Sequence, residues 1–336
     1  MKALVIGLGS MGKRRIRCLQ SLEINDIVGV DVRHDRRIEA MSKYDISVFP
    51  SLTDLWATGK PDIAIISLPP KLHVEAMREC MAHQVSFFVE ASVISDGLAE
   101  IAARAKEIGL IAAPSSTLYF HPAITKIFQI VRERRLGKIS NVLLHSGQYL
   151  ADWHTYESVS DYYVSDPSTG GAREIVPFEM TWFTKLFGFP SRVAGQYRKT
   201  IDIPGAEYID DTYNILLDYR TYLASITVDV VSRYATRRLT INGSDGQLIW
   251  SWDDPVIRIF ESSTDTWNDI HYEIENSESG YNNNIGEGMY IRETSAFIEA
   301  VLGKGKFPNS LEEDIQVLNL LYSIERSDKL ARFIEV

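Results

Sequence analysis

A glycine-rich turn near the start of the chain constrains the fold more than any other feature. The run Gly7-Leu8-Gly9-Ser10-Met11-Gly12 follows the apolar residues Ala3–Ile6, which predict a strand, and opens the amphipathic stretch Gly12–Leu22, which predicts a helix. Strand, glycine turn and helix in this order are typical of a unit that binds a dinucleotide. A glycine-rich turn without a ligand is the alternative.

Each of the three glycines has a different predicted role. Gly7 permits a tight turn, Gly9 lets a pyrophosphate approach the main chain, and Gly12 lets the helix pack closely on the strand. The anion would then lie at the helix N-terminus, where N–H groups and the helix dipole favour negative charge.

The next predicted strand, Ile27–Asp31, ends in an acid. Asp31 lies 31 − 12 = 19 residues after Gly12, close to the spacing of an acid that binds the adenosine ribose. A carboxylate there accepts hydrogen bonds from the ribose hydroxyls and repels a 2′-phosphate, so NAD is favoured over NADP. Arg33 and Arg36 follow closely, beside the expected cofactor, and would soften that preference. A solvated aspartate without a ligand is the alternative.

Four basic residues crowd the start of the first predicted helix: Lys13, Arg14, Arg15 and Arg17. Positive charge there opposes the helix dipole, so a negative group should offset it. A dinucleotide phosphate is one candidate, and a solvated helix face is the interpretation that we favour.

Short apolar runs alternate with longer amphipathic stretches through residues 1–118. Such alternation predicts an α/β fold with a doubly wound parallel sheet, because each parallel strand pair requires a crossover helix. The predicted strands are Ala3–Ile6, Ile27–Asp31, Ser47–Phe49, Ile63–Leu68, Ser86–Glu90 and Leu110–Ala113; the predicted helices are Gly12–Leu22, Arg36–Lys43, Ser51–Thr58, Leu72–His83 and Gly97–Ile108. Residues 1–118 are therefore expected to form a Rossmann domain.

The pattern changes in residues 119–336. Several runs alternate apolar with polar residues, which predicts an open, mainly antiparallel sheet in an α+β domain. The predicted strands are Val142–Tyr149, Asp211–Asp218, Ala224–Val231, Arg238–Asn242, Gln247–Trp252 and Val256–Glu261; the predicted helices are Ala123–Leu136, Val176–Leu186, Tyr290–Leu302 and Leu311–Asp328. The polar segment Asn276–Gly288 is expected to be a surface loop.

Charge and cysteine content exclude several classes of protein. The 336 residues hold 35 Lys and Arg against 45 Asp and Glu, a net charge of −10 that argues against a nucleic-acid partner. No run approaches the roughly 18 apolar residues of a membrane helix. Cys18 and Cys80 are too few for a disulfide framework and fit a reducing cytoplasm. No set of His, Cys, Asp or Glu has metal-ligand spacing, so no metal is expected.

Further motifs follow the later predicted elements. They are Ser67-Leu68-Pro69-Pro70-Lys71-Leu72-His73, Val89-Glu90-Ala91-Ser92, Leu118-Tyr119-Phe120-His121-Pro122-Ala123, Arg135-Leu136-Gly137-Lys138-Ile139, Gly170-Gly171-Ala172, Leu186-Phe187-Gly188 and Ile241-Asn242-Gly243-Ser244-Asp245-Gly246. With the glycine turn, they resemble the glucose–fructose oxidoreductase/inositol dehydrogenase (Gfo/Idh/MocA) family over nearly the whole chain.

The resemblance implies a Rossmann domain followed by a domain for substrate binding and oligomerisation. It implies NAD or NADP as cofactor, a sugar, cyclitol or nucleotide-sugar substrate, and a homodimer or homotetramer formed through the open sheet. Carried over by position, the cofactor contacts would be Gly7, Gly9, Ser10, Met11, Gly12, Asp31, Ser67, Pro69, His73 and Glu90.

The chain departs from the family at its usual proton-transfer positions. The catalytic lysine of the family is Ala91 here, and Ile175 and Phe178 stand where the family has an Asp and a His on a later helix. Oxidation of an alcohol needs a proton acceptor whose pKa lies near the working pH. Either other residues take that role, or the protein does not exchange hydride in the ordinary way.

Two segments offer substitute residues. In the first, His154 and Tyr156 are candidates for proton transfer, and Trp153 offers a flat surface for a sugar ring. A surface-loop histidine is the alternative for His154.

The second segment is Arg173–Glu179. Pro177 suits a first helical turn, so Glu174 is expected in the preceding loop as a catalytic acid or base, and Glu179 inside the helix. For Glu179, the alternative is an acid that stabilises a helix N-terminus. Arg173 would clamp a substrate carboxylate or phosphate, or pair with a nearby acid.

His121 is a further substrate-binding candidate, although orienting the chain is its favoured role. Three functions follow from these residues. The favoured one is an NAD-dependent oxidoreductase acting on a sugar. The others are an enzyme that uses tightly bound NAD in a net non-redox epimerisation or elimination, and a non-catalytic NAD-binding protein.

Overall fold

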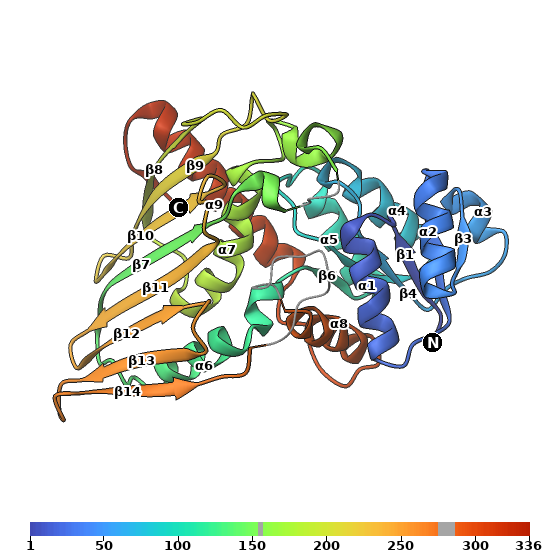
Figure 1. The fold of residues 1–336 in the computed structure, drawn as a ribbon. Helices are drawn as coiled ribbons and strands as arrows, with labels where there is room; N and C mark the ends of the chain where they lie inside the picture. Colours follow the sequence, from blue (N-terminus) through green and yellow to red (C-terminus); the bar gives the residue numbers. More distant parts are fainter. Residues whose placement is uncertain (154–156, 275–285) are drawn as a thin grey trace. The chain divides into compact units, whose positions relative to one another are not determined.

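The structure is a computed structural model that describes residues 1–153, 157–274 and 286–336 (Figure 1). The chain divides into two compact units. Unit 1 comprises Met1–Thr117 and Glu287–Gln316, and unit 2 comprises Leu118–Gly286 and Val317–Val336. The predicted second domain includes Glu287–Gln316, whereas in the structure these residues belong to unit 1.

Unit 1 is built on a six-stranded parallel sheet in the order β3-β2-β1-β4-β5-β6 (Figure 1). Its strands are β1 (Ala3–Ile6), β2 (Ile27–Val30), β3 (Ser47–Phe49), β4 (Ile63–Ile66), β5 (Ser86–Val89) and β6 (Ala112–Pro114). The strand order reverses between β1 and β4, and doubly wound sheets bind their ligands at such a point. The predicted doubly wound sheet is confirmed.

The crossover helices of unit 1 are α1 (Ser10–Ser21), α2 (His34–Tyr44), α3 (Leu52–Trp56), α4 (His73–Ala82) and α5 (Leu98–Glu107). The central strands are apolar throughout because helices cover both faces of such a sheet. Helix α8 (Gly288–Val301) belongs to the same unit, and its Phe297 is fully buried in one core with Phe88 of β5 and Ala113 of β6. The returning segment is thus part of the core of unit 1.

Unit 2 contains a nine-stranded sheet in the order β14-β13-β12-β11-β7-β10-β9-β8-β15, in which only the β7–β10 pair is parallel. The strands are β7 (Ile139–Gly147), β8 (Arg192–Arg198), β9 (Thr212–Asp218), β10 (Leu223–Asp229), β11 (Thr236–Gly243), β12 (Gly246–Ser251), β13 (Val256–Glu261), β14 (Thr266–His271) and β15 (Ile334–Glu335). Its helices are α6 (Pro122–Arg132), α7 (Ala172–Phe187) and the second half of α9 (Leu311–Leu330). The mainly antiparallel sheet of the prediction is confirmed.

One face of this sheet is covered and the other is open. In β9, Tyr213, Ile215 and Leu217 are buried on the side of α7, whereas Leu216 on the opposite side is 51% exposed. Large apolar side chains on the open side also include Leu143, Leu223, Ile249 and Trp267. Strands β8 and β14 escaped prediction because neither carries a clear apolar alternation, and β14 is exposed along most of its length.

Within the described residues, no helix has the length and apolar content needed to cross a membrane.

Candidate functional site

The glycine turn joins β1 to α1 at the point where the strand order reverses. Gly7 has φ +90°, a conformation that other residues rarely adopt, and a Cβ there would lie 2.4 Å from the carbonyl oxygen of Ser67. At Gly12, a Cβ would lie only 1.8 Å from the carbonyl oxygen of Gly7. Both glycines are therefore required for the close approach of α1 to the ends of β1 and β4.

The start of α1 is suited to an anion. Gly9 precedes the helix and has no side chain to cap it, and the first turn, which contains Ser10 and Met11, carries no acid. The first N–H groups of a helix have no partner within the helix and bind anions readily. A phosphate of a dinucleotide fits this arrangement.

Asp31 lies directly beside the turn. Its side chain is buried at the end of β2, where Oδ2 accepts a hydrogen bond from the Leu8 N–H (2.7 Å) and Oδ1 accepts one from the Arg33 N–H (2.8 Å). Each carboxylate oxygen has a further lone pair for a ribose hydroxyl. The Arg33 guanidinium pairs with Asp35, whereas the backbone N–H of Arg33 donates to Asp31.

The remaining candidate cofactor contacts follow β4 and β5. Ser67 and Pro69 lie in the turn after β4, and the Ser67 Oγ approaches Oε1 of Glu90 at 3.5 Å. His73 is buried, with its Nε2 2.7 Å from the carbonyl oxygen of Leu68. Burial lowers the pKa of His73, so the ring is neutral and fixes this turn rather than carrying charge.

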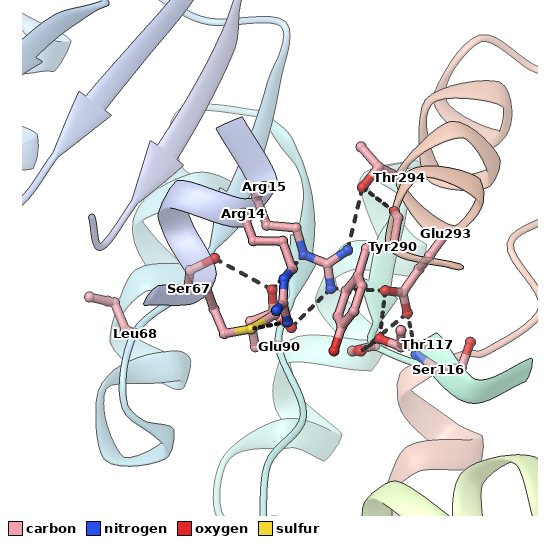
Figure 2. Close-up of polar contacts among 12 residues, drawn as sticks. Arg14, Arg15, Ser67, Leu68, Glu90, Ser116, Thr117, Tyr290, Glu293 and Thr294 are labelled. Atoms are coloured by element: carbon pink, nitrogen blue, oxygen red, sulfur yellow. Dashed lines mark hydrogen bonds and ion pairs between the residues drawn. The ribbon is translucent and has the colours of Figure 1, made fainter. Parts of the chain in front are cut away.

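The arginines of α1 do not form the solvated face that we favoured. Arg14 and Arg15 are 3% and 0% exposed, and carboxylates lie beside them (Figure 2). Arg15 donates to both oxygens of Glu90 (2.6 and 3.0 Å) and to Glu293 (2.8 Å). Arg14 and Arg17 pair with Glu287. Three arginines thus face three glutamates, because an unpaired charge would be unstable at this burial.

Glu293 of α8 is the innermost member of this group. It is fully buried and accepts hydrogen bonds from the Ser115 Oγ (3.1 Å), the Ser116 N–H (2.6 Å) and the Thr117 Oγ1 (2.8 Å), besides that from Arg15 (Figure 2). The carboxylate therefore joins α1, α8 and the chain after β6. Through Arg15 it also fixes Glu90, which follows directly on β5 and whose side chain is 12% exposed.

In unit 2, the surroundings of Glu179 indicate a structural role. It is fully buried in α7; its Oε1 accepts hydrogen bonds from Ser146 (2.7 Å) and from two nitrogens of Arg237 (2.8 and 2.7 Å), and its Oε2 accepts one from the Trp182 Nε1 (2.8 Å). Glu179 lies well beyond the first turn of α7, so the alternative of an acid that stabilises the helix N-terminus does not describe it.

Glu174 lies in the first turn of α7, not in a loop as predicted. The helix begins at Ala172, directly after Gly171, whose positive φ (+66°) suits glycine, and it tolerates Pro177 in its second turn. The Tyr163 hydroxyl donates to Oε1 of Glu174 (2.5 Å), whereas Oε2 is buried and has no hydrogen-bond partner among the described residues. Burial raises the pKa of Glu174 to about 7, although the Tyr163 hydrogen bond lowers it.

Two other candidate site residues, Arg173 and His121, form hydrogen bonds within the protein itself. Arg173 donates to Glu325 (2.6 Å) and to the carbonyl oxygen of Ser168 (2.7 Å), which supports the alternative of an arginine paired with a nearby acid. His121 precedes α6 and its Nδ1 accepts a hydrogen bond from the Ala123 N–H (3.2 Å), which supports an orienting role.

Trp153 lies at the edge of the described chain, and its buried Nε1 has no hydrogen-bond partner among the described residues. His154 and Tyr156 lie outside the described residues. Most of the expected surface loop at 276–288 also lies outside them.

One pair of side chains escaped the sequence analysis. His145 of β7 and Asp229 at the end of β10 lie on the open side of the sheet, with 2.7 Å between Nε2 and Oδ2. Burial raises the pKa of Asp229, but hydrogen bonds from His145, Ser232 and the Val231 N–H outweigh it and hold the pKa below its usual range. No local pattern indicates this pair, because 84 residues separate its members.

Comparison with known proteins identifies the family. Residues 1–113 match the model of an oxidoreductase family with an NAD-binding Rossmann fold, and residues 124–249 match the GFO/IDH/MocA C-terminal domain. The chain belongs to the Gfo/Idh/MocA oxidoreductase family. No curated protein matches it.

Solved structures share its fold over the full length. An oxidoreductase from Agrobacterium radiobacter, in complex with NAD+, L-tartaric acid and magnesium, is 11% identical (TM-score 0.84; 100% of this chain and 98% of that chain). Levoglucosan dehydrogenase in complex with NADH is 15% identical (TM-score 0.85; 100% and 99%), and an oxidoreductase domain protein from Kribbella flavida is 16% identical (TM-score 0.84; 100% and 99%). At sequence identities this low, the similarity to these structures shows the fold alone.

Among the described residues, no cluster of three or more His, Cys, Asp or Glu side chains is arranged to hold a metal ion.

Proposed function

We propose that this protein is an NAD(H)-dependent oxidoreductase that acts on a hydroxyl or carbonyl group of a sugar or nucleotide-linked sugar. The observation that carries the proposal is the position of Asp31, whose carboxylate is held by the Leu8 N–H beside a glycine turn that leaves the α1 N-terminus uncapped. Family membership and the sugar dehydrogenase among the structural neighbours support it.

The cofactor would be held by residues of unit 1. The main chain of Gly7, Gly9, Ser10, Met11 and Gly12 would bind the pyrophosphate, and Asp31 the adenosine ribose. Ser67, Pro69, His73 and Glu90 would line the edge of the sheet beyond it. When bound, the nicotinamide of the dinucleotide supplies the hydride acceptor or donor.

Glu174 is our candidate for proton transfer. Ala91 provides no proton acceptor, and Glu179 already accepts hydrogen bonds at both of its oxygens. Glu174 has a pKa of about 7 and a carboxylate oxygen without a described partner, as a general base near neutral pH requires. His154 and Tyr156 remain further candidates, with Trp153 as a surface for the sugar ring.

The proposal is tested by transfer of a label. NADH deuterated at C4 is incubated with the protein and a panel of keto sugars, and the products are analysed by mass spectrometry. We expect deuterium in at least one reduced sugar. Bound NADH with no label transfer to any carbonyl sugar would contradict the assignment.

One observation favours a second candidate function. Ala91 stands where the family has its usual proton-transferring lysine. The loss of that lysine would suit a protein that retains its cofactor and uses it in a net non-redox epimerisation or elimination. The test is to denature the purified protein and to measure the dinucleotide in the supernatant. One dinucleotide per chain, without turnover of added NAD, would support this candidate.

A stability measurement tests the environment of Glu174 without a substrate. The folded-state pKa of about 7 lies above the ordinary value of 4.5, so the folded protein binds this proton more tightly than the unfolded chain does. The free energy of unfolding should therefore fall as the pH rises from about 4.5 to about 7, by an amount on the order of 3 kcal/mol. Glu174→Gln should not show this fall.

The comparison uses urea denaturation of both proteins at about pH 5 and about pH 8. From about pH 5 to about pH 8, the free energy of unfolding of Glu174→Gln should rise by about 2–3 kcal/mol relative to that of the wild type. The matched control is Glu133→Gln, at the exposed residue directly after α6, whose stability relative to the wild type should not change between the two pH values. An equal difference between Glu174→Gln and wild type at both pH values would show that the carboxyl is not buried as described.

A further inference from the structure

Tyr163 is the one hydrogen-bond partner of the Glu174 side chain among the described residues. Its hydroxyl donates to Oε1 of Glu174, with 2.5 Å between the two oxygens, although 11 positions separate the residues in the sequence. Oε2 of the same carboxyl is buried and accepts no hydrogen bond from a described residue. The two oxygens of Glu174 are therefore not equivalent, and Tyr163 makes the difference between them.

The backbone around Tyr163 is held against the start of α7. Tyr163 opens a short 3₁₀ helix, and the carbonyl oxygen of the next residue, Val164, accepts a hydrogen bond from the Gly171 N–H (3.1 Å). A Cβ on Gly170 would lie only 1.9 Å from that same oxygen. Because Gly171 directly precedes α7, this close approach keeps Tyr163 beside the first helical turn, which carries Glu174.

The hydrogen bond determines which oxygen of Glu174 carries the proton. The Tyr163 hydroxyl occupies Oε1, so the acid form of Glu174 has its proton on Oε2. The same hydrogen bond is stronger to the carboxylate than to the neutral acid, because hydrogen bonds to a charged acceptor are the stronger ones. It therefore opposes the effect of burial and limits the pKa of Glu174 to about 7.

We infer that Tyr163 is a positioning residue for Glu174: its hydroxyl holds Oε1 and leaves Oε2 to exchange a proton with the oxygen of the sugar. When a sugar carbonyl is reduced, its carbon receives the hydride of the cofactor and its oxygen receives the proton of Oε2. Glu174 is then left as a carboxylate, which the Tyr163 hydroxyl stabilises. The inference rests on the role proposed above for Glu174, and it adds the residue that aligns this carboxyl.

The first test needs no substrate. Urea denaturation compares the wild type with Glu174→Gln, and Tyr163→Phe with the double variant that carries both substitutions, from about pH 5 to about pH 10. In each pair the difference in stability changes with pH until Glu174 is ionised in the folded protein, and then it levels off. We expect the pair that carries Tyr163→Phe to level off about one to two pH units higher, the shift for loss of one hydrogen bond to a charged group.

The second test is the pH profile of kcat/KM for reduction of the keto sugar that accepts label from deuterated NADH. Reduction requires Glu174 in its acid form, so kcat/KM of the wild type should fall as the pH rises through the pKa of about 7. In Tyr163→Phe the same fall should occur about one to two pH units higher.

Tyr208→Phe is the matched control. It removes the same hydroxyl group in the same unit, from a side chain that is 83% exposed. This variant should keep both pH dependences of the wild type.

Three results would overturn the inference. Identical pH dependences in Tyr163→Phe and wild type would show that the hydroxyl does not act on Glu174. A loss of kcat/KM by the same factor at every pH would show a merely structural role, and an equal shift in Tyr208→Phe would show an effect that is not local. If the wild type transfers no label although the urea comparison shows the expected shift, the proposed function fails, and the use of this contact in proton transfer fails with it.

Discussion

Gly12→Ala should abolish measurable dinucleotide binding. The added methyl group would lie 1.8 Å from the carbonyl oxygen of Gly7, so α1 must move away from the turn. The main-chain N–H groups that would bind the pyrophosphate move with it. Loss of two charge-assisted hydrogen bonds, at about 1.5–3 kcal/mol each, weakens binding by at least about 100-fold. Calorimetric titration with NADH measures the loss.

The matched control is Gly305→Ala in the same unit, where a Cβ would have no neighbour within 4 Å. This variant should bind NADH with unchanged affinity. Because the Gly12 substitution also crowds the packing of α1, circular dichroism should accompany the titration, to establish that the fold persists. Folded Gly12→Ala that binds NADH as tightly as the wild type would contradict the placement of the cofactor at the turn.

Glu293→Ala should destabilise unit 1 by about 3–5 kcal/mol, the range for removing one partner from a buried ion pair. The substitution leaves Glu90 as the only carboxylate paired with the fully buried Arg15 among the described residues, and it removes the acceptor for Ser115, Ser116 and Thr117. A loss of this size is a large fraction of the roughly 5–15 kcal/mol that stabilises a typical protein. Urea denaturation at neutral pH measures it.

Glu299→Ala provides the comparison, because Glu299 lies on the same helix, α8, at an exposed position. Its free energy of unfolding should stay within about 0.5 kcal/mol of the wild type. Glu293→Gln keeps the shape of the side chain and removes the charge, so it should be intermediate. Equal stability of Glu293→Ala and Glu299→Ala would show that the Arg15 contacts contribute nothing.

The sequence predicts the fold of unit 1 well because its signals are local. Each strand of the parallel sheet is a short apolar run, and the turn at Gly7–Gly12 depends on steric limits that only glycine satisfies. The position of Asp31 follows from the same regularity, since one helix and one strand separate it from the turn. In unit 2, β8 and β14 escaped prediction because their residues lack the alternation of a half-buried strand.

The side-chain environments depend on contacts between residues far apart in the sequence. Arg15 and Glu293 are 278 residues apart, so the basic start of α1 resembles a solvated face when the sequence alone is considered. The helix start predicted at Val176 from Pro177 is four residues too late, because helix propensities do not reveal the positive φ of Gly171 directly before the true start at Ala172. The partner of Glu179, Arg237, comes from a strand that follows much later.

The central claim is that unit 1 binds an adenine dinucleotide through its glycine turn and Asp31. Calorimetric titration of the wild-type protein with NADH, after any retained dinucleotide has been removed, tests it most directly. We expect a saturable heat corresponding to one molecule per chain. No heat with either NADH or NADPH at millimolar concentration, from a protein that contained no dinucleotide when purified, would contradict the claim.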